Sequence, residues 1–136
     1  MTQQDHNLNQ TRRLYALSAA GDWAAVRDML DDDFCATEAP GLPYAGTFRG
    51  KDGLRALFVL VMGMMAIEAM DLIEMTAGGD WVIVLVTMRA RDADGPFDIE
   101  LAEATRYRDG RVIELKPFYF DPAAVHRAVA AKCAAA

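Results

Sequence analysis

The chain has 136 residues, of which 53% are apolar and 25% are charged, and its formal net charge is −6. This length suits one domain with its own core and is too short for two. The acidic balance and the lack of any Lys or Arg cluster argue against a nucleic-acid partner.

Two short helices are predicted at the start of the chain. Residues 1–6 are polar, with no basic segment followed by an apolar one, which indicates a flexible end rather than a targeting signal. The spacing of apolar residues predicts a helix over residues 7–20, and Gly21 is placed to end it. Asp22 then caps a second helix that reaches Leu30.

An acidic segment, a strand and a loop are predicted next. Residues 31–33 are three aspartates, which we expect to form a solvated, frayed exit from the second helix because acids there oppose the helix dipole. Residues 34–38 predict a short strand, on which Glu38 shares a face with Phe34. Residues 39–50 hold two prolines and three glycines among apolar side chains, which is typical of a loop that covers part of the molecule.

The next segments predict one helix and two strands. Helical spacing of apolar residues predicts a helix over residues 51–65. Residues 66–76 alternate imperfectly and predict a strand, whereas residues 81–91 are β-branched and apolar and form a clear one.

A β-hairpin completes a predicted four-stranded antiparallel meander. Asp109 and Gly110 form its turn, since this pair suits the tight turns of hairpins. On the strand before the turn, Glu103 falls on the apolar face with Leu101 and Thr105. A last helix is expected from residue 121 toward residue 130, because Asp followed by Pro suits a helix start.

Two glutamates therefore point inward, Glu38 and Glu103. Burial of an ionised carboxylate without partners costs several kcal/mol, so each is paired, protonated or beside a wet cavity. In one apolar cavity the two would oppose each other's ionisation, so one is expected to hold its proton near neutral pH. The alternative is that either glutamate lies at a strand end and reaches water or an arginine.

Other kinds of site are not expected from these residues. Cys35, Cys133, His6 and His126 are too few for a disulfide framework or a multi-histidine metal site. We expect no metal and no cofactor, so acid–base chemistry would rest on carboxylates and tyrosines. The longest apolar run, residues 56–67, is too short to span a bilayer, so we expect a cytoplasmic protein without a membrane partner.

The order of these elements resembles the nuclear transport factor 2-like superfamily, and its ending is most similar to the SnoaL-like polyketide-cyclase branch. Five segments carry the resemblance: residues 19–23, 30–34, 48–53, 107–112 and 118–124. It implies one α+β domain over residues 1–136, with a curved antiparallel sheet wrapped as a cone around the N-terminal helices, a short C-terminal helix and flexible ends at 1–6 and 131–136. It also implies a homodimer through the outer sheet face.

The resemblance also implies roles for site residues. Glu38 matches the carboxylate base of the ketosteroid isomerase branch, and Glu103 with Tyr107 matches its neutral acid and a nearby aromatic residue. Leu14 stands where that branch has a tyrosine, and Tyr15 lies one residue later, so Tyr15 is the candidate third catalytic residue.

The expected ligand is an apolar small molecule, such as a polyketide- or steroid-like carbonyl compound. Candidate substrate-binding residues are aromatic or flexible and apolar: Tyr44, Phe58, Met62, Tyr107 and Tyr119. The alternative for each of these residues is that it packs in the core and does not contact a ligand. The resemblance fits a cofactor-independent isomerase or cyclase, or alternatively a non-catalytic ligand-binding or association module.

Overall fold

A computed structural model describes residues 1–136 and confirms an α+β fold. The elements follow in the order α1 (Gln3–Ala20), α2 (Trp23–Met29), β1 (Leu30–Glu38), β2 (Gly46–Arg49), α3 (Gly53–Met64), β3 (Ala69–Gly78), β4 (Trp81–Asp92), β5 (Gly95–Arg108), β6 (Arg111–Tyr119) and α4 (Pro122–Ala135). None of the four helices has both the length and the apolarity that crossing a membrane requires.

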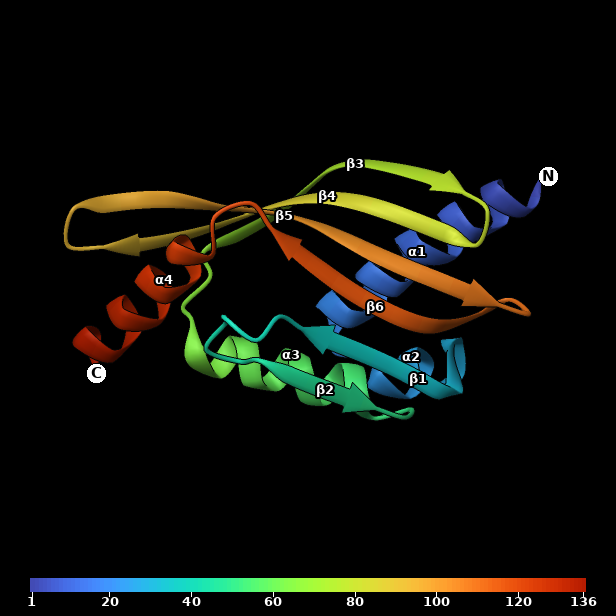
Figure 1. Ribbon diagram of the computed structural model, residues 1–136, viewed down its shortest axis with the longest axis horizontal. Coiled ribbons are helices and arrows are strands. Elements are labelled where there is room, and N and C mark those ends of the chain that lie inside the picture. The colour runs from blue at the N-terminus through green and yellow to red at the C-terminus, as the bar shows by residue number, and fades with distance from the viewer.

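The six strands form one curved, open sheet in the order β2-β1-β6-β5-β4-β3 (Figure 1). The predicted meander of β3 to β6 is antiparallel throughout, but β1 runs parallel to β6, so the sheet is mixed rather than purely antiparallel. Strand β2 was not predicted, because its four residues lie within the segment read as a Pro/Gly-rich loop.

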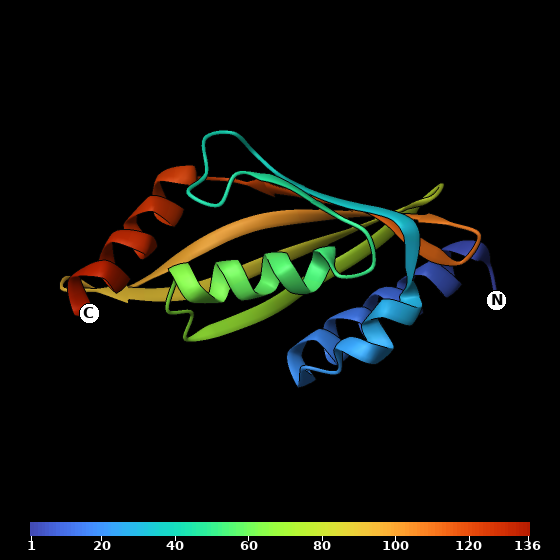
Figure 2. The same ribbon diagram turned by 90° about the horizontal axis from the view of Figure 1, so that it is seen from below.

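Helices α1, α2 and α3 lie on one face of the sheet, and α4 lies at the far end of the long β4–β5 hairpin (Figure 2). Arg127 holds α4 there, because its guanidinium bonds Asp92 at 2.5 and 3.0 Å and lies 3.8 Å above the ring of Phe97. The two ends of the chain are far apart (Figure 1).

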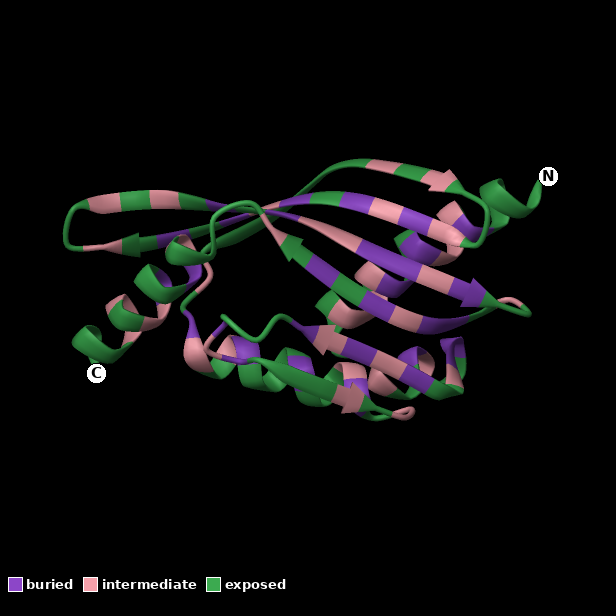
Figure 3. Ribbon diagram, viewed as in Figure 1, coloured by how far each residue is buried: buried purple, intermediate pink, exposed green.

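The core lies between these helices and the sheet. Buried and exposed residues alternate along β4 and β5 (Figure 3), as strands with one wet face require. Val82, Val84 and Val86 of β4 are all buried. On β5, Leu101 and Thr105 are buried, so the predicted inward face of this strand is confirmed.

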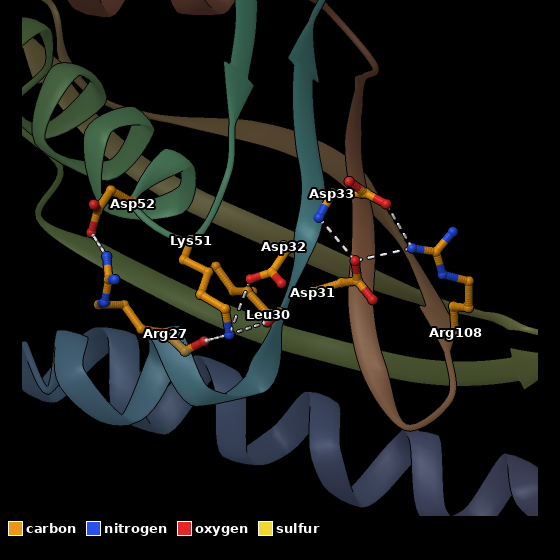
Figure 4. Close-up of polar contacts among 8 residues, drawn as sticks. All are labelled: Arg27, Leu30, Asp31, Asp32, Asp33, Lys51, Asp52 and Arg108. Atoms are coloured by element: carbon orange, nitrogen blue, oxygen red, sulfur yellow. Dashed lines mark hydrogen bonds and ion pairs between the residues drawn. The ribbon is translucent and has the colours of Figure 1, made fainter.

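The three aspartates after α2 belong to β1 and are not a frayed helix end. Arg108 donates to Asp31 and Asp33, each at 3.0 Å (Figure 4). Lys51 Nζ donates to the backbone oxygens of Arg27, at 3.2 Å, and Leu30, at 3.0 Å. These two cations supply the positive charge that the acidic segment needs at this end of the helix.

Both terminal helices are longer than predicted. Thr2 and Asp5 form a capping box, which starts α1 at Gln3 instead of residue 7. Helix α4 begins after Asp121 as predicted and continues to Ala135. Most of residues 1–6 and 131–136, expected to be flexible, are therefore helical.

The hairpin turn between β5 and β6 is confirmed. Asp109 and Gly110 both have positive φ, at 52° and 79°. That backbone suits the two-residue turn whose twist matches the flanking strands. A bulge between Arg106 and Tyr107 shifts the register beyond the turn, so that Glu103 pairs with Pro117.

Candidate functional site

A cavity of about 610 Å³ lies between α1, α2 and α3 and the inner face of the sheet. Of its 22 lining residues, 17 are hydrophobic, so a ligand must be mostly apolar. The polar lining residues are Ser18, Glu38, Glu68, Glu103 and Thr105, and no Lys, Arg or His takes part. No group of three or more His, Cys, Asp or Glu is arranged to hold a metal ion anywhere in the chain.

The structure brings six of the eight predicted site residues to this cavity: Glu38, Glu103, Tyr15, Phe58, Met62 and Tyr119. Tyr44 and Tyr107 lie outside the lining. Tyr44 contacts the cavity only through Tyr119, to which it is hydrogen-bonded. The Tyr107 hydroxyl is buried against Thr11 of α1.

The two glutamates lie in one row across the sheet. In the parallel ladder Ala36 pairs with Leu115, and continuing this register by two residues places Glu38 beside Pro117. Glu103 pairs with Pro117 from the other side. Two strand spacings separate the glutamates, or roughly 10 Å between their backbones, so both carboxyl groups can face one ligand.

Glu103 is the hydrogen-bonded member of the pair. It is half-buried, and the Tyr15 hydroxyl donates to its Oε1 at 2.5 Å. Burial raises the pKa of Glu103, while the bond from Tyr15 acts in the opposite direction because it stabilises the ionised form. The bond also fixes the direction of the carboxylate.

Glu38 has no such support. Its side chain lies at the end of β1, the residue is 3% exposed, and Oε1 has no hydrogen-bond partner. Burial, and then the charge of Glu103, raises the pKa of Glu38 to about 8. At neutral pH Glu38 therefore keeps its proton, while the hydrogen bond from Tyr15 favours the carboxylate form of Glu103 against the effect of burial.

Further lining residues were not predicted as part of the site. The Trp23 ring lies 5.2 Å from the Phe58 ring, and both line the cavity, with Phe58 partly exposed. Nothing in the sequence spacing of Trp23 marks it as a residue of a cavity wall. Thr105 was placed on the face of Glu103, but only the structure leaves its Oγ1 buried, without a partner, in the cavity wall.

Comparisons with known proteins agree with the resemblance noted in the sequence. A model of the SnoaL-like domain matches residues 11–115. Uncharacterized proteins of Mycobacterium tuberculosis and Mycobacterium bovis are 31% identical over 124 residues, which cover 88% of this chain and 93% of each relative.

Solved structures share the fold. An NTF2-like protein of unknown function from Burkholderia pseudomallei has a TM-score of 0.75 at 25% identity, covering 95% of this chain and 98% of that one. A protein described as a SnoaL-like polyketide cyclase, from Jannaschia sp., has a TM-score of 0.75 at 18% identity, covering 94% of each chain.

Proposed function

Because the chain belongs to the SnoaL-like domain family, we propose that its cavity binds a neutral, apolar carbonyl compound and moves a proton at the carbon next to the carbonyl. The observation that carries this proposal is the pair of glutamates, Glu38 and Glu103, which face one apolar cavity and differ in that only Glu103 accepts a hydrogen bond, from Tyr15. Such a pair supplies a base and an acid at the same pH.

The lining supports a neutral ligand. Three carboxyl groups and no basic side chain border the cavity, so a carboxylate or phosphate on the ligand would be repelled and left without a counter-ion. A volume of about 610 Å³ is in the range that holds drug-sized molecules. A polyketide- or steroid-like compound with several rings fits these limits.

The contacts favour Glu103 as base and Glu38 as acid, which reverses the roles expected from the sequence. Tyr15 donates to Glu103 and so favours its carboxylate form. Glu38 keeps its proton up to a pH of about 8 and can donate it, or a hydrogen bond, to a developing enolate oxygen.

In the proposed step the Glu103 carboxylate removes a hydrogen from the carbon beside the carbonyl group. The electrons of that C–H bond form a C=C bond, and the carbonyl oxygen takes up negative charge that Glu38 neutralises by giving its proton. In an isomerisation Glu103 gives its proton to another carbon of the ligand, and the enol O–H proton returns to Glu38 as the C=O bond forms again. In a cyclisation the enol carbon attacks a second carbonyl carbon of the ligand, the enol O–H proton returns to Glu38, and Glu103 gives its proton to the oxygen of the attacked carbonyl.

The test uses 2-tetralone, a neutral bicyclic ketone, in heavy water, with deuterium uptake followed by NMR. Glu103→Gln should lower the exchange rate by about 100-fold or more, since it removes the base. Glu38→Gln should lower it less, because the amide still donates a hydrogen bond. Glu100→Gln, on the exposed face of the same strand as Glu103, is the matched control and should exchange at the rate of the unchanged protein.

Two results would contradict this proposal in different ways. A larger loss in Glu38→Gln than in Glu103→Gln would restore the roles expected from the sequence. Binding of tetralone without exchange above the buffer rate would make the protein a non-catalytic binding module.

A further inference from the structure

The four tyrosines differ in where their single hydroxyl proton goes. The Tyr15 hydroxyl donates its one hydrogen bond to Glu103. The Tyr107 hydroxyl oxygen lies 2.8 Å from Thr11 Oγ1, and the Thr11 hydroxyl already donates its hydrogen bond to the backbone oxygen of Asn7 at 2.7 Å. Tyr107 must therefore donate to Thr11, and neither Tyr15 nor Tyr107 has a proton left for a ligand.

Tyr119 is different because it accepts a hydrogen bond and donates none. The Tyr44 hydroxyl donates to the Tyr119 hydroxyl at 2.5 Å, and the two rings are 6.3 Å apart and tilted. Tyr119 lines the cavity, and its own O–H has no acceptor within the protein. It is thus the one tyrosine with an uncommitted proton at the cavity wall.

Tyr44 is held firmly enough to orient Tyr119. It is fully buried in the segment between β1 and β2, beside buried Leu42, whose backbone nitrogen donates to Ala39 at 3.0 Å. His126 of α4 bonds the backbone oxygen of Gly41 in the same segment at 2.8 Å. A hydroxyl that accepts a bond from a fixed donor also becomes a stronger donor itself.

Glu38 faces the same space as Tyr119. Its Oε1 is buried without a partner, and no hydrogen bond joins it to Tyr119. Burial raises the pKa of Tyr119, so its proton stays in place. A ligand oxygen with two lone pairs could accept from Tyr119 and from neutral Glu38 together, which would satisfy both groups.

We infer that Tyr119 donates a hydrogen bond to the carbonyl oxygen of the bound ligand, and that Tyr44 is the positioning residue that aims it. This rests on the proposed function, in that the ligand must carry a carbonyl group. In this arrangement the carbonyl oxygen lies at the C-terminal end of β6, beside Glu38, and Glu103 with Tyr15 lies next to the carbon that loses its proton.

The experiment compares two probes of equal shape, 2-acetylnaphthalene and 2-isopropenylnaphthalene, in which a CH₂ group replaces the carbonyl oxygen. Tyr119→Phe should weaken binding of acetylnaphthalene roughly 3- to 10-fold and leave isopropenylnaphthalene unchanged. With a ¹³C-labelled carbonyl, infrared spectra should show the bound C=O stretch at lower frequency in the unchanged protein than in Tyr119→Phe.

Tyr44→Phe should give a smaller effect of the same kind, and no added effect when Tyr119→Phe is already present. Tyr107→Phe removes a hydroxyl outside the cavity and is the matched control for the binding ratio and the C=O frequency. Three results would overturn the inference: no preference for acetylnaphthalene in the unchanged protein, equal loss of both probes in Tyr119→Phe, or an unchanged C=O frequency in that variant. None of these readouts needs turnover, so they separate this inference from the exchange test on tetralone.

Discussion

Glu38 carries an energetic cost that nothing else in the protein offsets. A buried polar atom without a partner costs about 1–3 kcal/mol, and Oε1 of Glu38 is such an atom. Its neighbours on the strand, Ala36 and Phe34, are ordinary buried apolar residues. An apolar residue at this position would make the folded protein more stable. A carboxyl group there is therefore best explained by a role in binding a ligand.

This cost predicts a pH-dependent stability difference between the protein and Glu38→Gln. The unfolded chain ionises Glu38 at its ordinary pKa of 4.5, whereas the folded protein keeps the proton up to about 8. Between these values the unfolded state binds fewer protons, so the contribution of Glu38 to stability falls by roughly 1.4 kcal/mol per pH unit as the pH rises, and levels off above about 8. Urea unfolding at pH 5, 6.5 and 8 should show the free energy of unfolding of Glu38→Gln rising relative to that of the unchanged protein, by a few kcal/mol over this range. Parallel stability curves for the two proteins would rule this out.

The inward placement of both glutamates could be predicted from the sequence, but the protonation state of each carboxyl group could not. Alternation along a strand puts Glu38 with Phe34, and Glu103 with Leu101, on the core side. Which carboxyl is ionised depends on the donor that reaches it, and Tyr15 comes from a helix nearly ninety residues away in the chain. Tyr44 was predicted as a wall residue, since the sequence does not reveal that Tyr119 stands between it and the cavity.

At the scale of elements, the close approach of α3 to β2 depends on Gly53. A Cβ added there would lie 2.8 Å from the backbone oxygen of Phe48, which belongs to β2. Because that atom is backbone, it cannot move aside as a side chain end would. Helix α3 forms one wall of the cavity, so this contact sets the distance between the wall and the edge of the sheet.

Gly53→Ala should therefore destabilise the protein by roughly 1–3 kcal/mol, as over-packing does. Gly63, in the last turn of the same helix, has nothing within 4 Å of an added Cβ. Gly63→Ala is the matched control and should stabilise by about 0.5–1 kcal/mol, because Ala favours the helix. Thermal unfolding of both variants checks this, and equal shifts in the two would show that the Phe48 contact is unimportant.

The elements with a strong hydrophobic periodicity could be predicted from the sequence. Those that form only through pairing with a distant strand could not. Strand β4 and the β5–β6 hairpin have clear alternation and turn signals, and their positions agree with the structure within a residue or two. Strand β2 is formed by pairing with β1, where Phe48 lies opposite Ala36, and its short sequence has no pattern of its own. Likewise β1 includes three aspartates only because Arg108 and Lys51 reach them.

At the scale of the whole molecule, the sheet has helices on one face and leaves much of the other uncovered (Figure 2). Cross-strand ion pairs lie on this outer face, where Arg89 bonds Asp98 at 3.3 Å and Arg106 bonds Glu114 at 3.2 Å. Between them runs an apolar row across three strands, in which Leu85 pairs with Ala102 and Ala102 pairs with Phe118. Leu85 is 47% exposed and Phe118 is 54% exposed.

We expect this apolar row to meet the same row of a second copy, which gives a two-fold homodimer with the ion pairs at its rim. Light scattering after size-exclusion chromatography should give twice the chain mass at tens of micromolar. Leu85→Glu should yield monomers, because it places a charge in the centre of the contact beside Glu74, its pairing partner on β3. Val59→Glu alters an apolar residue of α3 that is 59% exposed, and serves as the control that keeps the dimer. If Val59→Glu yields monomers and Leu85→Glu does not, the copies meet through the exposed face of α3. Elution of the unchanged protein as a monomer would rule out the dimer altogether.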